Sequence, residues 1–251
     1  MATAVDAAKV DEDTVWQARC ELAACYRLCA LFGWDDHVAT HASYRLPDGT
    51  FLLNPFNLMF EEITASNLIR VDIEGNVIEP EDGQMNPAAY TVHSAVLDGR
   101  PDVNAAIHLH TRDGMAVSAH KDGLLPLTQT AMLIHHDIAY HEFEGIVFDP
   151  AERERLQADL GEKNVLILRN HGTLTCGQSM AAAFGRMFIL ESACAAQIAA
   201  MSMGDVHMPK PDVIAHMNET MSNPWAEQFT MMTMWPAMLR KAQRECPGFD
   251  Q

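Results

Sequence analysis

Three histidines have the residue type and spacing of a metal site. His108 and His110 lie two residues apart in an apolar run, so on a strand both rings would leave the same face. Their backbones would be about 6.5–7 Å apart. One ion can bridge such a pair, because metal–nitrogen bonds are about 2.0–2.1 Å long. The third candidate, His171, follows the apolar segment 165–168 and precedes Gly172, which permits a close backbone approach or a positive φ. The spacing also fits two histidines on a solvent-facing strand, so the residues leave both readings open.

The elements that must position these histidines follow from hydrophobic periodicity and turn residues. The pattern predicts helices and strands that interleave without a low-complexity linker or a repeat, which favours one α/β domain of three layers. Hairpins imply antiparallel pairs, so the sheet should be mixed. The predicted helices are 12–31, 87–98, 112–119, 150–160, 179–203 and 225–244. The predicted strands are 42–46, 50–53, 68–73, 77–78, 103–110, 145–148 and 165–169.

Composition excludes several classes of partner. The 251 residues contain 17 Lys and Arg against 34 Asp and Glu, a formal net charge of −17. Such a surface repels phosphate backbones and anionic lipid, so we expect no nucleic-acid partner and no membrane partner. No apolar segment reaches the ~18 residues that a membrane span requires.

The cysteines and the first residues indicate a cytoplasmic location. Six cysteines occur without a C-x-x-C pair, so neither a disulfide framework nor a zinc ribbon is expected. Cys25 and Cys29, four residues apart on a predicted helix, should pack as small apolar groups. The N-terminal residues lack the basic and apolar regions of a secretory signal.

Several separated motifs give the chain a family resemblance over about residues 15–205. The segments 101–111 (PDVNAAIHLHT) and 165–172 (VLILRNHG), preceded by 52–55 (LLNP) and 71–77 (VDIEGNV), resemble the class II aldolase and adducin head-domain family. The resemblance implies a three-layer α/β/α sandwich around a mixed β-sheet. It also implies a homotetramer or other homo-oligomer with sites near subunit boundaries. We therefore expect a class II aldolase/adducin-like domain over residues 1–205. Residues 206–251 would form a C-terminal helical extension that packs on the same or a neighbouring subunit.

By the same resemblance, His108, His110 and His171 would be the protein ligands of a divalent metal. Zinc is the expected ion, as in the sugar-phosphate aldolases, with Fe, Mn or Co as alternatives. Three neutral histidines leave open coordination positions, as in catalytic sites.

The sequence departs from the aldolase pattern at the catalytic carboxylate. Aldolases of this family place a Glu four residues before a helical histidine; here that histidine matches His93, and position 89 is Ala. Small polar loops that hold a substrate phosphate are also altered, with His41, Phe56 and Ala88 in their place. A phosphorylated sugar is therefore not the expected substrate.

Another group would have to replace the missing acid/base residue. His93 is the first candidate, followed by His41 and the cluster 135–142, although each could instead be a structural polar group. Tyr140 would lend a proton from a neighbouring subunit, by analogy only. Phe56 and Met59 are expected to line a pocket or the core.

Together these features predict a divalent-metal-dependent carbon–carbon lyase of aldolase or decarboxylase type. Its substrate would be a small, non-phosphorylated hydroxy- or oxo-acid, because decarboxylation can proceed without the base that begins retro-aldol cleavage. Ala89 also fits a non-catalytic, adducin-like oligomerisation module, against which the three intact histidine ligands argue. Three histidines can also hold Fe(II), which leaves a non-haem iron oxygenase open.

Overall fold

The structure, a computed structural model, describes residues 11–145, 151–223 and 225–251. Most of the strand predicted at 145–148 and most of the N-terminal segment considered as a signal lie outside the described residues.

The described residues form one eight-stranded mixed sheet in the order β4-β3-β2-β1-β5-β8-β7-β6. Neighbouring strands are antiparallel except β6 and β7, which are parallel, so the predicted mixed sheet is confirmed. The strands are β1 His41–Arg45, β2 Phe51–Leu53, β3 Ile69–Val71, β4 Val77–Glu79, β5 Ala105–Leu109, β6 Ile138–His141, β7 Val165–Leu168 and β8 Gly172–Gly177.

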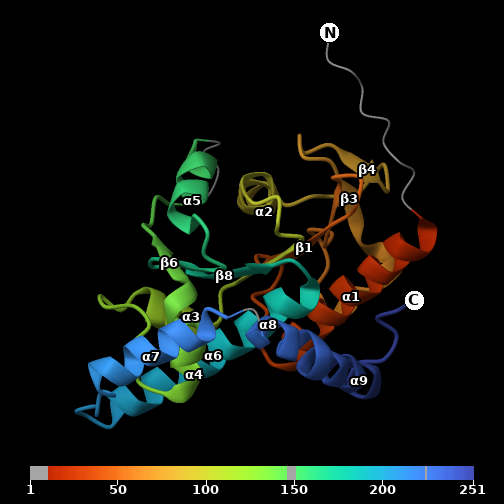
Figure 1. The fold of residues 1–251 in the computed structure, drawn as a ribbon. Coiled ribbons are helices and arrows are strands. Elements are labelled where there is room, and N and C mark those ends of the chain that lie inside the picture. The colour runs from red at the N-terminus through yellow and green to blue at the C-terminus, as the bar shows by residue number, and fades with distance from the viewer. Residues whose placement is uncertain (1–10, 146–150, 224) are drawn as a thin grey trace.

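Helices cover both faces of this sheet, which makes the three-layer α/β/α sandwich (Figure 1). On one face lie α1 Glu12–Leu31, α3 Arg112–Ser118, α4 Gln129–Ile134, α6 Met180–Ser202 and α9 Trp235–Glu245. On the other lie α2 Pro87–Gly99 and α5 Glu152–Leu160. Short 3₁₀ turns occur at η1 Phe60–Glu62, η2 Ala65–Asn67 and η3 His135–Asp137. No helix within the described ranges is long and apolar enough to cross a membrane.

The helix α2 illustrates how local sequence sets an element. Asn86 caps its N-terminus by accepting a hydrogen bond from the Ala88 amide at 3.0 Å. Pro87 occupies the first turn, where its missing N–H costs no helical hydrogen bond. Val92 and Val96 then face the core beside β5 and β7. The helix therefore presents a fixed face to the sheet, with His93 in its interior.

The C-terminal residues return to the body of the same chain. The predicted helix 225–244 is divided into α8 Trp225–Phe229, a π-helical segment at 230–234 and α9, and α7 Pro211–Met221 precedes it. Trp235, Ala242 and Phe249 are buried in the core shared with α1 and α6. The amide of Ala65 donates to the Phe249 carbonyl at 2.7 Å. The division at residue 205 stays a prediction.

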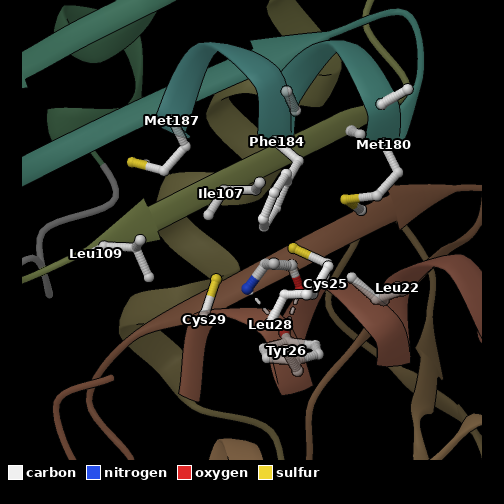
Figure 2. Close-up of a cluster of buried hydrophobic side chains, with 14 of the residues drawn as sticks. Leu22, Cys25, Tyr26, Leu28, Cys29, Ile107, Leu109, Met180, Phe184 and Met187 are labelled. Atoms are coloured by element: carbon white, nitrogen blue, oxygen red, sulfur yellow. Dashed lines mark hydrogen bonds between the residues drawn. The ribbon is translucent and has the colours of Figure 1, made fainter. Parts of the chain in front are cut away.

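The main core lies between α1, β5 and α6. Leu22, Ile107 and Phe184 meet there, and Cys25 and Cys29 are buried among them as expected (Figure 2). The residues of α6 that face β5 and α1 are buried, in keeping with the apolar composition of this helix.

Tyr26 ties α1 to the first strands. Its hydroxyl oxygen accepts hydrogen bonds from the amides of Ala42 at 2.7 Å and Asn54 at 3.2 Å. Its single proton is within reach of the Ala42 carbonyl at 2.5 Å and the Asn54 Oδ1 at 2.8 Å. The ring is fully buried, so removal of the hydroxyl would leave polar groups unpaired in the core.

We expect Tyr26→Phe to lower the free energy of unfolding by about 1–3 kcal/mol, because the amides of Ala42 and Asn54 lose their partner without gaining water. Tyr90→Phe is the matched control, since its half-buried hydroxyl makes one hydrogen bond, to the Ile73 carbonyl at 2.8 Å. Urea denaturation should show the larger loss in Tyr26→Phe. Equal losses in the two variants would contradict this role.

Candidate metal centre

Three neighbouring strands, β5, β8 and β7, bring the predicted histidines together at one end of the strands. His108 lies in β5 opposite Leu174 of β8, and His110 follows the end of β5. His171 occupies the tight turn between β7 and β8, where its amide donates to the Leu168 carbonyl at 3.1 Å. The β8 strand was not predicted. It pairs with both β5 and β7 and so holds His171 beside His108 and His110.

Gly172 provides the close approach that the sequence suggested. A Cβ at this position would lie 2.5 Å from the Leu109 carbonyl oxygen and 2.9 Å from Cδ2 of His110. The positive φ of this turn, 56°, belongs to Asn170 and not to Gly172. Position 172 therefore requires glycine because β5 and β8 leave no room for a side chain there. The left-handed conformation falls on Asn170, a residue type that tolerates it.

The three imidazoles converge through their Nε2 atoms. The Nε2 of His110 lies 2.9 Å from Nε2 of His108 and 2.9 Å from Nε2 of His171. The candidate ligand atoms of all three residues lie within 4.8 Å of one another. These are the residues that the H-x-H spacing and the His-Gly strand end pointed to, and the fold places them together.

The hydrogen bonds of two rings define which nitrogens carry protons. Nδ1 of His108 lies 3.0 Å from the Thr173 carbonyl oxygen, which can only accept. Nδ1 of His110 lies 3.1 Å from Oδ2 of Asp36. Both Nδ1 atoms are therefore the donors, and in the neutral rings both Nε2 atoms carry lone pairs.

Two lone pairs at 2.9 Å repel each other unless a cation lies against them. Protonation of His108 and His171 is disfavoured, because burial lowers the pKa of His108 well below its ordinary value and that of His171 to about 4. Neutral imidazole nitrogens are ligands that suit zinc, iron and related divalent metals. The donor set therefore fits a divalent metal ion.

Two further imidazoles form a buried chain beside the triad. His41 lies opposite His108 in the β1–β5 pairing, with the two ring centroids 5.0 Å apart. Its Nδ1 is 2.7 Å from Nε2 of His93, whose Nδ1 is 2.6 Å from Oγ of Ser43. Burial lowers the pKa of His93 to about 3 and that of His41 well below its usual value. His41 is therefore the immediate neighbour of the triad, and His93 lies one ring further away.

Tyr140, the other predicted catalytic residue, lies in β6, and β7 and β8 separate that strand from β5. Its hydroxyl accepts a hydrogen bond from the Leu124 amide at 3.1 Å, and the Arg169 guanidinium stacks over its ring at 4.2 Å. Within the described part of one chain, Tyr140 therefore contacts Leu124 and Arg169, and it makes no hydrogen bond or ring contact with the three histidines. Its role toward a neighbouring subunit stays a prediction.

Sequence reasoning missed two groups around the triad. Asp36 reaches His110 from the segment between α1 and β1, and no local motif distinguishes it from the adjacent Asp35. Phe143 is exposed, with its ring centroid 6.4 Å from that of His171. Position 89, where the family's Glu was sought, is a buried Ala.

A buried carboxyl group lies behind the end of β5. A Cβ on Gly114 would meet both Thr111 Oγ1, at 2.6 Å, and Oε1 of Glu191, at 3.1 Å, so these groups lie close together just after His110. Burial raises the pKa of Glu191 to about 7. In the window between the usual Glu pKa and 7, the folded protein therefore binds more protons than the unfolded chain, and its stability falls as pH rises.

We expect Glu191→Gln to become more stable relative to wild type as pH rises from 5 to 8, because the amide never has to lose a proton in the core. The rise of the Glu191 pKa from 4.5 to about 7 corresponds to about 3 kcal/mol in the free energy of unfolding. Urea denaturation at both pH values measures the difference, with Glu219→Gln on the exposed face of α7 as control. A difference between Glu191→Gln and wild type that is the same at pH 5 and pH 8 would refute the raised pKa.

The fold and the site together define an α/β sandwich protein with a histidine cluster that could hold a metal ion. Residues 20–198 match the family described as Class II Aldolase and Adducin N-terminal domain, and the chain belongs to this family.

Three relatives show how widely this family extends. An aldolase II superfamily protein from Pseudomonas syringae has a crystal structure that is 45% identical, with a TM-score of 0.89 over 96% of this chain and 98% of that chain. The L-fuculose 1-phosphate aldolase from Glaciozyma antarctica PI12 is 29% identical, with a TM-score of 0.81 over 95% and 94%. The alpha-adducin of Mus musculus is 42% identical over 185 residues, which are 72% of this chain and 25% of that protein.

Proposed function

We propose that this protein is a divalent-metal-dependent carbon–carbon lyase, of aldolase or decarboxylase type, acting on a small, non-phosphorylated hydroxy- or oxo-acid. The observation that carries the proposal is the convergence of the Nε2 atoms of His108, His110 and His171. Zinc is the proposed ion, with Fe, Mn or Co as alternatives.

The donor set supports a catalytic role more than a structural one. Closed structural zinc sites have four protein ligands, whereas three protein ligands leave a position for substrate. When bound there, a divalent cation supplies Lewis-acid stabilisation of the negative charge that develops as a carbon–carbon bond breaks. Thr173 and Asp36 orient two of the rings toward the shared centre.

The polar groups of the altered loops support a substrate without a phosphate. Nδ1 of His41 is taken by His93, and Asn54 is bonded to Tyr26. The side chain of Asn86 caps α2. Of the groups that could donate to a phosphate, the Asn54 amide and Nδ1 of His41 are thereby paired within the protein, and the net charge of −17 adds no attraction for an anion.

The neighbouring imidazoles give the site a polar wall. We propose His93 as a residue that orients His41, since the two rings share one short hydrogen bond and only His41 adjoins His108. Tyr140 would act only on the site of a second subunit. A small-molecule substrate, a homotetrameric or other homo-oligomeric assembly and a cytoplasmic location complete the proposal, supported by the family fold and by six free cysteines.

His171→Ala should abolish bound metal and leave the protein folded, because the turn is polar and partly exposed while the core is untouched. Elemental analysis of purified protein measures the metal, and circular dichroism checks the fold. His216→Ala, on the exposed face of α7, is the matched control and should keep its metal. Unchanged metal content in His171→Ala would remove the assignment.

The reaction itself is tested by an anaerobic screen of metal-reconstituted protein. Hydroxy-acids and aromatic carboxylic acids are offered, and release of carbon dioxide or an aldehyde is followed. We expect turnover of an unphosphorylated acid that is lost in His171→Ala. A preference for a sugar phosphate would contradict the proposed substrate class. Product that forms only with iron and dioxygen would favour the oxygenase, an alternative that rests on the donor set alone.

An adducin-like oligomerisation module is the second candidate. Its support is the 42% identity to alpha-adducin, higher than the 29% to the fuculose phosphate aldolase, together with Ala89. The metal analysis separates the candidates, because a purely structural module has no need of an open three-histidine site.

A further inference from the structure

The carboxylate of Asp36 lies between two imidazoles. Its Oδ2 accepts a hydrogen bond from Nδ1 of His110 at 3.1 Å, and its Oδ1 lies 3.1 Å from Nδ1 of His37. His110 is 74 residues away in the chain, so the contact depends on the tertiary fold. The Asp36 side chain is 37% exposed, which leaves its charged form hydrated while it touches the site.

The segment that carries Asp36 is anchored. The Trp34 ring packs against Phe32, Phe184 and Phe188, with centroid distances of 4.9, 6.2 and 5.9 Å. The Trp34 amide donates to the Cys29 carbonyl at the end of α1. After the carboxylate, the Ala39 amide donates to the Asp36 carbonyl at 2.9 Å and closes a turn that leads into β1. The position of Asp36 is therefore set by the core beneath it.

We propose that Asp36 is a positioning residue for the metal centre: it holds the His110 ring with its proton on Nδ1 and its Nε2 lone pair toward His108 and His171. This inference rests on the proposed metal site. A carboxylate that accepts a hydrogen bond from a metal-binding histidine fixes the tautomer of that ring. It also raises the basicity of the nitrogen that binds the metal. The carbonyl of Thr173 fixes the tautomer of His108 in the same way, but this carbonyl carries no charge.

The need for this charge follows from the ligand set. Three neutral imidazoles contribute no negative charge to a divalent cation, and position 89, where the family's aldolases carry a carboxylate, is Ala. Asp36 supplies one negative charge through a single hydrogen bond. Charge-assisted hydrogen bonds of this kind are about twice as strong as neutral ones.

Asp35 provides a matched control. It is adjacent, half-buried and of the same residue type, and the described residues give it no hydrogen bond to a histidine of the triad. Replacement of either aspartate changes the net charge equally, so long-range electrostatics are matched. Only the contact to His110 differs.

The first test is Zn²⁺ affinity, measured by competition with a chromogenic chelator on metal-stripped protein. Asp36→Ala should raise the dissociation constant by about 10–100-fold. Asp36→Asn should fall between Asp36→Ala and wild type, because its amide oxygen can still accept from Nδ1 but carries no charge. Asp35→Asn should stay within about twofold of wild type, since it leaves His110 untouched.

The second test reads the tautomer directly, by ¹⁵N NMR of the imidazole nitrogens in metal-free protein. We expect His110 to show a protonated Nδ1 in wild type and Asp35→Asn, and a mixture of tautomers in Asp36→Ala. A general loss of structure would not produce this selective change. Wild type that takes up no Zn²⁺ would overturn the metal site and this inference with it. Wild type that binds Zn²⁺ while Asp36→Ala matches Asp35→Asn in both tests would overturn the role of Asp36 alone.

Discussion

The structure around the site depends on one electrostatic constraint: imidazole nitrogens that carry lone pairs are held against one another. The pairing of β5 with β8 and the tight turn from β7 fix the backbones of His108, His110 and His171, and hydrogen bonds to Thr173 and Asp36 direct two of the rings inward. Such an arrangement is costly by itself and is relieved by a cation. Burial adds to the constraint, because it opposes the alternative of protonating His108 or His171.

Two further imidazoles and one carboxylate surround the triad. His41 and His93 fill the side next to His108 with a chain of imidazoles that ends at Ser43, and this chain is buried and neutral. The carboxylate beside the triad is that of Asp36 in the α1–β1 segment, whereas position 89 in α2 is a buried Ala. The family fold therefore carries a triad whose polar neighbours come from β1, α2 and the α1–β1 segment.

Much of the fold could be predicted because its elements carry strong local signals. The α2 boundaries follow from Pro87 and Gly99, and α6 from its long apolar run. The β8 strand was missed because its alternation of Leu174 and Cys176 with two threonines is short and lies between glycines that are typical of turns; it forms because β5 and β7 offer hydrogen-bonding edges on both sides. The helices α4 and α7 were also missed, since α4 is short and none of the described side chains of α7 is buried.

The sequence by itself predicted the mixed α/β sandwich and marked the three histidines as candidates, because strand alternation and a strand-end His-Gly are local patterns, and the resemblance of its separated motifs predicted the family and the ligand set. Only the tertiary structure decided what surrounds them. Asp36 is 74 residues from His110, and His41 meets His93 across 52 residues, so no local pattern distinguishes Asp36 from Asp35 or orders the two imidazoles relative to the triad. Such contacts arise when the strand order of the sheet brings distant segments together, and the strand order is a property of the whole chain.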